Sequence, residues 1–344
     1  MNETKPIIHL VGSIPLDDAE TVFRTLGRRI GNYAKRIPDG ETGRRQRWIS
    51  FVMDQLKSNP VFEVDQSLPP FQFKQYDGTV VYEISRLTIR DGVDPKTIIF
   101  DTGYADDAIR NFATFNKLQN EGVIPARMKY QIDMATPLAI TYNFMVPAIY
   151  EVFSKIYTEH LAVEFSRIQE SLPHDRISYQ WDVCQEVLMW EAYYDQFPGY
   201  KDQIFSVLGR IGDMVPADID LGYHLCYGSP KDEHMILPKD MTNLVEIANG
   251  IIESVSRPVQ YVHMPVPKDS NDDNFFAPLS GLKLGDSDLY LGLVHVGDAA
   301  GSASKLAAAQ KYTDVAGIAT ECGMGRGDPA NLEPVLNISL KLVE

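Results

Sequence analysis

The stretch Ile219-Asp220-Leu221-Gly222-Tyr223-His224-Leu225-Cys226 combines the two features that decide the fold and the chemistry of this chain. It is a short run of β-type residues that ends in two metal-capable side chains, and a helical pattern over Met241–Ser256 follows it. A strand followed by a helix is the building unit of a parallel sheet, because parallel neighbours need a crossover connection.

The same unit recurs along the chain, where seven further β-type runs alternate with helical patterns. The eight predicted strands are Ile7–Val11, Lys35–Pro38, Arg127–Ile132, Ile177–Trp181, Ile219–Leu225, Val259–Val262, Tyr290–Val296 and Gly317–Thr320. The predicted helices include Ala19–Gly31, Met145–Ser171, Met241–Ser256 and Ser304–Ala316. Eight strand–helix units close a (β/α)8 TIM barrel, so we predict an α/β fold of this type.

No repeat, charge block or low-complexity linker divides the 344 residues, and residues 1–344 are therefore predicted to form a single (β/α)8 barrel domain. The segment Gly78–Thr102 contains two β-type runs, Thr79–Ile84 and Thr97–Phe100, which predict an inserted β-hairpin between units two and three. A doubly wound sheet is the alternative, but no Gly-rich phosphate-binding fingerprint follows the first strand.

The composition excludes several classes of protein. Lys and Arg number 32 against 47 Asp and Glu, and the net charge of −15 argues against nucleic acid or an anionic membrane as a partner. The most apolar stretch, residues 135–153, is interrupted by two prolines and predicts a buried loop and helix. Three cysteines are too few for a disulfide scaffold and favour a reducing, cytoplasmic location.

In a TIM barrel the active site lies at the C-terminal ends of the strands. Nearly every predicted strand of this chain ends in a polar or metal-capable residue. In chain order these residues are Ser13, Glu41, Thr136, Asp182, His224, Cys226, His263, His295, Asp298 and Cys322. Their convergence at one face predicts the candidate active site.

His224 and Cys226 lie two positions apart at a strand end, so both side chains point to the same side of the strand. Cys322 lies far downstream, at the end of the last strand, which faces the fifth strand across a closed barrel. Two Cys and one His with an open fourth position are typical of catalytic zinc. The alternative for an unpaired cysteine is a small buried hydrophobic residue, and this is our interpretation of Cys184.

Five short motifs, taken in order, resemble the catalytic barrel of cobalamin-independent methionine synthase, whose wider group includes the zinc thiol alkyltransferases and the uroporphyrinogen decarboxylase-like barrels. The motifs are Val11-Gly12-Ser13-Ile14-Pro15, Asp39-Gly40-Glu41-Thr42-Gly43-Arg44-Arg45, Gln180-Trp181-Asp182, His224-Leu225-Cys226-Tyr227 and Glu321-Cys322-Gly323. The resemblance runs over nearly the whole chain. It implies a TIM barrel with a zinc ion bound by His224, Cys226 and Cys322.

The resemblance also implies a binding site for an amino acid that carries a thiol. Ser13 and Glu41 match the residues that hold the carboxylate and ammonium groups of homocysteine, and Asp182 matches an aspartate that contacts the same molecule. A hydroxyl group can receive a carboxylate, and acidic groups can receive an ammonium ion. The alternatives are an ion pair of Glu41 with Arg44 or Arg45, and an N-cap role for Asp182.

The chain departs from the family at two strand ends. Strand six ends in His263, where the methionine synthases carry a zinc-binding glutamate. His263 is therefore predicted as a fourth zinc ligand, as a contact to another ligand or to substrate, or as a histidine with a structural hydrogen bond. At strand seven the family's Asp-x-His proton-transfer unit is replaced by His295-Val296-Gly297-Asp298, and we predict His295 as the acid–base group, with Asp298 as the second candidate. No stretch matches the methyl-folate site.

Two groups of arginines have no assigned role in this scheme. The run Arg44-Arg45-Gln46-Arg47-Trp48 could attract an anionic substrate group, and Arg326, just after Cys322, is a comparable candidate. Ion pairs at the surface are the alternative for such charges.

Together these features predict a zinc-dependent enzyme that transfers an alkyl or methyl group to a small thiol. Zinc would activate the thiol as a nucleophile, so the expected partners are a small-molecule thiol and an alkyl donor. Three alternatives stay open: zinc-assisted C–S bond cleavage, a metal-free decarboxylase of the uroporphyrinogen type, and a non-catalytic barrel that binds a small molecule. The oligomeric state also stays open, with a homodimer among the options.

Overall fold

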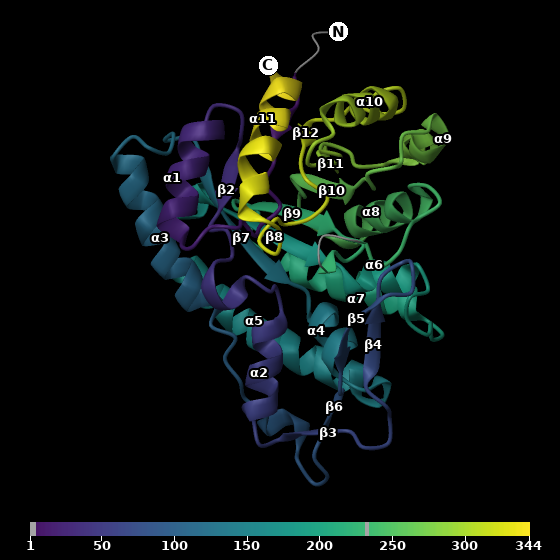
Figure 1. The fold of residues 1–344 in the computed structure, drawn as a ribbon. Helices are drawn as coiled ribbons and strands as arrows, with labels where there is room; N and C mark the ends of the chain where they lie inside the picture. The colour runs from purple at the N-terminus through teal and green to yellow at the C-terminus, as the bar shows by residue number, and fades with distance from the viewer. Residues whose placement is uncertain (1–4, 231–233) are drawn as a thin grey trace.

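The core of the protein is an eight-stranded parallel sheet that curls on itself (Figure 1). The computed structural model describes residues 5–230 and 234–344. The strands are β1 Ile7–Ile8, β2 Arg36–Pro38, β7 Lys129–Ala135, β8 Ile177–Val183, β9 Asp220–Leu225, β10 Tyr261–Pro265, β11 Asp288–Gly292 and β12 Gly317–Ile318. Their order is β1-β12-β11-β10-β9-β8-β7-β2. Each of the eight predicted strands is present.

The two ends of this strand order lie side by side. The backbone N–H of Ile8 in β1 donates to the carbonyl of Tyr33, just before β2, at 2.8 Å. Beyond the strands, the N–H of Ile14 donates to the carbonyl of Gly40 at 2.9 Å. An open sheet keeps its edge strands apart, so these contacts confirm the predicted (β/α)8 barrel over a doubly wound sheet.

Helices surround the sheet (Figure 1). They are α1 Ala19–Ile30, α2 Ser50–Ser58, α3 Tyr104–Asn120, α4 Pro137–Phe144, α5 Tyr150–Ser171, α6 Gln185–Trp190, α7 Tyr200–Asp213, α8 Thr242–Ser254, α9 Asp273–Phe276, α10 Ala299–Ala309 and α11 Leu332–Val343. The helix predicted over Ser304–Ala316 is displaced, because the Asp298 carboxylate caps α10 by accepting from the N–H of Gly301 at 2.9 Å.

The apolar stretch 135–153 forms the fully buried α4, a short 3-10 turn over Pro147–Ile149 and the beginning of α5. The predicted helix Met145–Ser171 thus begins later, at Tyr150. Within residues 5–230 and 234–344 we find no helix with the length and apolar character that crossing a bilayer requires.

An insertion lies between the second and third barrel strands, on the side opposite to the two termini (Figure 1). It contains α2 and the short strands β3 Phe62–Val64, β4 Phe71–Lys74, β5 Val80–Ile84 and β6 Leu87–Ile89. β4 pairs antiparallel with β5, and β3 pairs antiparallel with β6.

The predicted pairing of Thr79–Ile84 with Thr97–Phe100 is not found. The partner of β5 is the upstream strand β4, because an Asp77-Gly78 turn joins the two. Gly78 has a φ of 86°, and the Asp77 carboxylate accepts from the N–H of Thr79 at 2.8 Å. Residues 95–97 form a 3-10 turn instead of a strand.

The interior of the barrel is filled by side chains, and Gly222 on β9 shows how tightly. A Cβ atom at Gly222 would lie 2.0 Å from Cζ of Tyr261, whose ring occupies the space inside the sheet. Because alternate residues face the same side, His224 and Cys226 point into the same interior as Gly222, but nearer the C-terminal mouth.

We expect Gly222→Ala to destabilise the fold by about 1–3 kcal/mol, since an added methyl group overpacks the interior. The measurement is the free energy of unfolding in urea. Gly281→Ala is the matched control, because the nearest atom to its added Cβ is 3.8 Å away. Equal stability of both variants would contradict the packing described here.

Candidate metal centre

The metal-capable group is formed by β9 and the loop that follows β12. One ligand atom from each of His224, Cys226 and Cys322 lies within 4.8 Å of the other two. His224 and Cys226 are buried, and Cys322 is partly exposed. The barrel therefore brings together three side chains that the sequence separates by almost a hundred residues.

The spacing of these atoms fits a common ion. The Sγ atoms of Cys226 and Cys322 are 3.6 Å apart. Two sulfurs bound at ~2.3 Å to one tetrahedral zinc ion would lie about 3.8 Å apart. His224 Nε2 is buried and has no hydrogen-bond partner within the described ranges. A buried nitrogen without a partner is unfavourable, and a metal ion would satisfy it.

Burial sets the protonation of the group. It lowers the pKa of His224 to about 4, so the imidazole is neutral at pH 7, as a metal ligand must be. The nearby Cys184 thiol, and burial, raise the pKa of Cys226 well above its ordinary value. The contact with Cys226, and burial, likewise raise the pKa of Cys322. Metal binding must therefore displace thiol protons.

His263 lies beside His224 on the neighbouring strand β10. The Nδ1 atoms of the two rings are 2.7 Å apart, so one donates and the other accepts. This contact occupies Nδ1 of His224 and leaves Nε2 for an ion. In the described part of the chain His263 is not a member of the three-residue group, and its position is that of a residue that orients a ligand.

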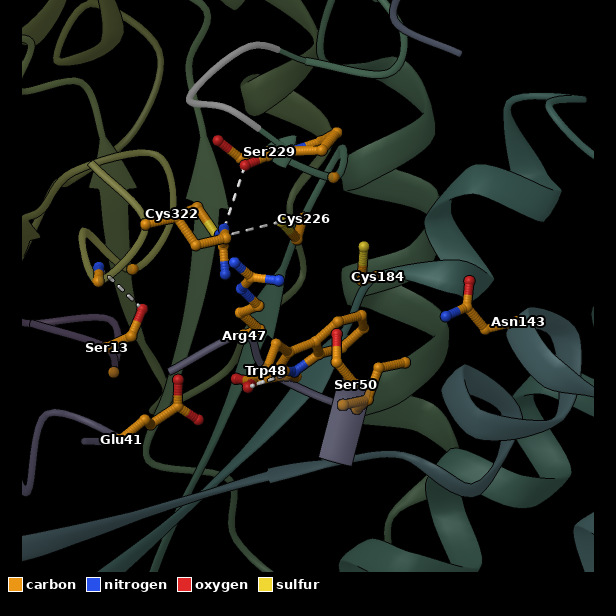
Figure 2. Close-up of a pocket in the computed structure, with 18 of the residues that line it drawn as sticks. Ser13, Glu41, Arg47, Trp48, Ser50, Asn143, Cys184, Cys226, Ser229 and Cys322 are labelled. Carbon is orange, nitrogen blue, oxygen red and sulfur yellow. Dashed lines mark hydrogen bonds between the residues drawn. The ribbon is translucent and has the colours of Figure 1, made fainter. Parts of the chain in front are cut away.

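A cavity of about 820 Å³ opens above this group (Figure 2). The predicted substrate residues Ser13, Glu41 and Asp182 line it together with the three metal-capable residues. Ser13 packs against the loop after β12, where its Oγ accepts from the N–H of Gly325 at 3.2 Å. The six residues that both the strand ends and the family resemblance point to therefore line one cavity. They are Ser13, Glu41, Asp182, His224, Cys226 and Cys322.

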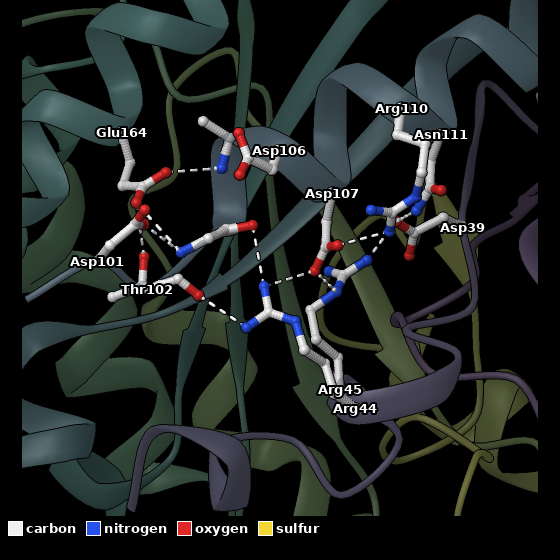
Figure 3. Close-up of polar contacts among 12 residues, drawn as sticks. Asp39, Arg44, Arg45, Asp101, Thr102, Asp106, Asp107, Arg110, Asn111 and Glu164 are labelled. Carbon is white, nitrogen blue, oxygen red and sulfur yellow. Dashed lines mark hydrogen bonds and ion pairs between the residues drawn. The ribbon is translucent and has the colours of Figure 1, made fainter. Parts of the chain in front are cut away.

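A polar network around Asp39, Arg45 and Asp107 (Figure 3) fixes the backbone of Glu41, whose side chain lines the cavity. The Asp39 carboxylate accepts from the backbone N–H of Glu41 at 2.9 Å, from Asn111 at 2.7 Å and from Arg45. Arg44 pairs with Asp107 at 2.8 Å. Glu41 makes no ion pair with either arginine in the described ranges, so that alternative is wrong and its carboxylate faces the cavity instead.

Two hydrogen bonds fix Asp182. Trp48 Nε1 donates to Oδ2 at 3.2 Å, and Gln180 Nε2 donates to Oδ1 at 3.0 Å. The residue at the N-cap of α6 is Cys184, so the N-cap role considered for Asp182 is wrong. Cys184 is buried, as expected, but it also lines the cavity (Figure 2).

Asp133 on β7 forms an acidic cluster with Glu41 and Asp182. It is not among the residues predicted from the strand ends. Its Oδ2 is buried without a hydrogen-bond partner in the described ranges, and a Cβ at Gly12 would lie 3.3 Å from it. Burial and the nearby Asp182 raise the pKa of Asp133 well above its ordinary value. The predicted strand ends at Ile132, so Asp133 follows the strand end even more closely than Thr136 does and could have been chosen from the sequence in the same way.

The outer wall of the cavity comes from the insertion and from α4. Val81, Tyr82 and Ile84 of the hairpin β4–β5 line the cavity together with Asn143 and Phe144 of α4. No sequence motif points to this wall, because the pairing that shapes it depends on the turn at Asp77-Gly78.

His295 and Asp298 lie outside this cavity. His295 lines an adjoining cavity of about 440 Å³, where its Nε2 donates to the carbonyl of Val266 at 2.9 Å and its Nδ1 lies 3.0 Å from Glu321. Asp298 caps α10 and lies 3.3 Å from Lys305. Their catalytic role stays a prediction, and Glu321, which also contacts His234, is a further polar group beside Cys322.

Comparison with known proteins was made at three levels. No family model matches the chain, and no curated protein sequence matches it. A B12-independent methionine synthase from Shewanella sp. W3-18-1, solved with selenomethionine, has a similar structure with a TM-score of 0.63 at 14% identity, over 99% of this chain and 96% of that chain. The chain shares its fold.

Two other solved structures agree. A putative vitamin-B12 independent methionine synthase from Listeria monocytogenes gives a TM-score of 0.58 at 13% identity, over 99% of this chain and 98% of that chain. A methyltransferase from Methanosarcina mazei gives 0.58 at 10% identity, over 99% and 94%. The resemblance stated from the motifs is thus confirmed at the level of the fold, over nearly the whole chain.

We expect His263→Leu to weaken divalent metal binding about 10–100-fold, because it removes the hydrogen bond that orients His224. The measurement is a competition titration with Co²⁺, followed by its thiolate absorption bands. His263→Asn, which can restore the hydrogen bond, should recover part of the affinity, whereas His160→Leu on α5 should change nothing. An unaltered affinity of His263→Leu would rule out the orienting role.

Glu41 should make the stability of the metal-free protein depend on pH. Burial raises the pKa of its carboxyl group to about 7. The folded chain then keeps a proton that the unfolded chain releases above its ordinary pKa, so stability falls as pH rises toward 7. Glu41→Gln should gain stability relative to the wild type from about pH 5 to about pH 8. Urea unfolding measures this, and Glu253→Gln on the exposed side of α8 should show no such trend.

Proposed function

We propose that this protein is a zinc-dependent transferase that moves an alkyl group, such as methyl, to a small thiol. The observation that carries the proposal is that the two sulfurs, 3.6 Å apart, and a ring nitrogen of His224 all lie within 4.8 Å of one another. Two Cys and one His leave one tetrahedral position open, which is typical of catalytic rather than structural zinc. The solved structures that share the fold include two named as methionine synthases and one as a methyltransferase.

In this proposal His224, Cys226 and Cys322 hold the ion, and His263 orients His224. When bound, zinc supplies Lewis acidity that lowers the pKa of a thiol in its open position. The chain's own contribution is a ligand set fixed at two strand ends, with His224 and Cys226 buried and Cys322 partly exposed. Because burial keeps His224 neutral, only the two thiols must lose protons when the ion enters.

The floor of the cavity is suited to the polar end of the thiol substrate. Ser13 offers a hydroxyl group to a carboxylate, and Glu41 and Asp182 offer carboxyl groups to an ammonium ion. The raised pKa of Glu41, near 7, means that this group becomes fully charged only when a cation arrives or the pH rises. A thiol with an amino group is therefore the substrate class we infer.

His295 is proposed as the proton-transfer group, acting at the adjoining cavity. Its Nε2 must carry a proton, because the carbonyl of Val266 can only accept. Its Nδ1 lies 3.0 Å from the carboxyl group of Glu321, the residue before Cys322, so a partner for proton transfer stands beside the ring. Asp298 is the weaker candidate of the two, because its carboxylate already accepts from the N–H of Gly301 and from Lys305 in α10.

The decisive variant is Cys226→Ser. It should lose most bound zinc, measured by elemental analysis, and all alkylation of a homocysteine-like thiol, since a hydroxyl group is a poor replacement for thiolate at zinc. Cys184→Ser is the matched control, because Cys184 lines the same cavity but does not belong to the three-residue group. It should keep its zinc.

Undiminished zinc in Cys226→Ser would refute the ligand set. A wild-type protein purified under reducing conditions that neither contains nor takes up zinc would support the metal-free decarboxylase instead. Zinc and thiol binding without turnover would support the non-catalytic binding barrel.

A further inference from the structure

Two arginines line the main cavity without a carboxylate partner. Arg326 and Arg47 form no ion pair with any described residue, although the chain carries an excess of acidic residues. Unpaired guanidinium groups beside a cavity are candidates for binding an anion, because their N–H groups match the geometry of oxyanions.

Arg326 is held in one orientation by two contacts. Its Nε donates to the carbonyl of Ser229 at 3.3 Å, and its Nη2 donates to Sγ of Cys322 at 3.4 Å. Neither partner is a carboxylate, and Nη1 makes no hydrogen bond within residues 5–230 and 234–344. The guanidinium is therefore fixed in place with donor capacity left for a ligand.

Arg47 differs from its neighbours in the same run. Arg44 donates to the carbonyls of Thr102 and Gly103 and pairs with Asp107, and Arg45 pairs with Asp39 (Figure 3). Arg47 has no such partner among the described residues, and its side chain extends into the cavity (Figure 2). Arg44 and Arg45 therefore stabilise the loop, whereas the guanidinium group of Arg47 is available to a ligand in the cavity.

The charge of the metal centre does not neutralise these arginines. Two thiolates and a neutral imidazole balance one divalent ion, so the ligand set carries no excess negative charge once the ion is bound. Glu41 and Asp182 lie at the floor, where we place the amino group of the thiol. The cavity therefore presents two guanidinium groups that form no ion pair among the described residues.

We propose that Arg47 and Arg326 form a subsite for an oxyanion group, a carboxylate, sulfonate or phosphate, on the second substrate. The alkyl donor would then be an anionic molecule, bound with its charged group between the two guanidinium groups. The assignment of the anion to the alkyl donor rests on the proposed function, but the anion subsite itself can be tested without zinc or turnover.

The experiment is a fluorine NMR titration of the zinc-free full-length protein with trifluoroacetate and, separately, with trifluoromethanesulfonate, at constant ionic strength. The first probe is a carboxylate and the second a sulfonate, so the two arms distinguish the shapes of anion. Arg47→Gln and Arg326→Gln should each weaken binding about tenfold, the effect of losing one charge-assisted hydrogen bond. The affinity of Arg326→Lys should fall between those of the wild type and Arg326→Gln, because lysine keeps the charge and loses the forked pair of N–H donors.

Arg28→Gln is the matched control, since it removes the same charge from an exposed position on α1, outside the cavity. Equal binding by wild type, Arg47→Gln and Arg326→Gln, or no binding by wild type, overturns the subsite. Arg47 forms no hydrogen bond or ion pair with a metal-capable residue in the described part of the chain, so its variant decides the question even if Arg326→Gln disturbs Cys322. Zinc content and thiol alkylation are measured separately, so an anion subsite without zinc chemistry refutes only the proposed function.

Discussion

The close approach of Cys226 and Cys322 is the constraint on which the rest of the site depends. One sulfur follows β9 and the other follows β12, so their 3.6 Å separation exists only when the sheet has closed. The pairing of β1 with β12 brings Ser13, from the loop after β1, against the backbone of Gly325. A barrel with a slipped register would move every one of these groups, because each is fixed to a strand end.

A chain of buried polar groups inside the barrel joins the two halves of the site. His224 contacts His263, whose ring centroid lies 5.8 Å from that of His9. His9 Nε2 lies 3.0 Å from Gln180 Oε1, and Gln180 Nε2 donates to Asp182 at 3.0 Å. These contacts run from the metal-capable His224 to the carboxyl group of Asp182 through the interior of the barrel. Buried polar networks of this kind fix side-chain orientations, because any unsatisfied member is costly.

The sequence predicts the barrel, all eight strands and the metal-capable group, since strand ends must converge once the sheet type is known. The sequence does not predict which of several possible partners a side chain will pair with in the folded protein. Both Glu41 and Asp39 are possible ion-pair partners of Arg45 in the sequence, and in the structure the ion pair forms with Asp39. The hairpin partner of β5 depends on a local turn, and the burial of Asp133 depends on packing against Gly12. Pairing between side chains and between strands depends on packing in three dimensions, so it cannot be predicted from sequence patterns alone.

The hairpin β4–β5 has a consequence for how such a protein can diverge. Its strands form a sheet of their own, so its hydrogen bonds are independent of the eight-stranded sheet. Val81, Tyr82 and Ile84 line the cavity, whereas the three metal-capable residues lie on the barrel. Mutations in this ribbon can therefore change which molecules are admitted while leaving the chemical machinery intact, which makes it the place where natural selection can act on specificity at the lowest risk to folding.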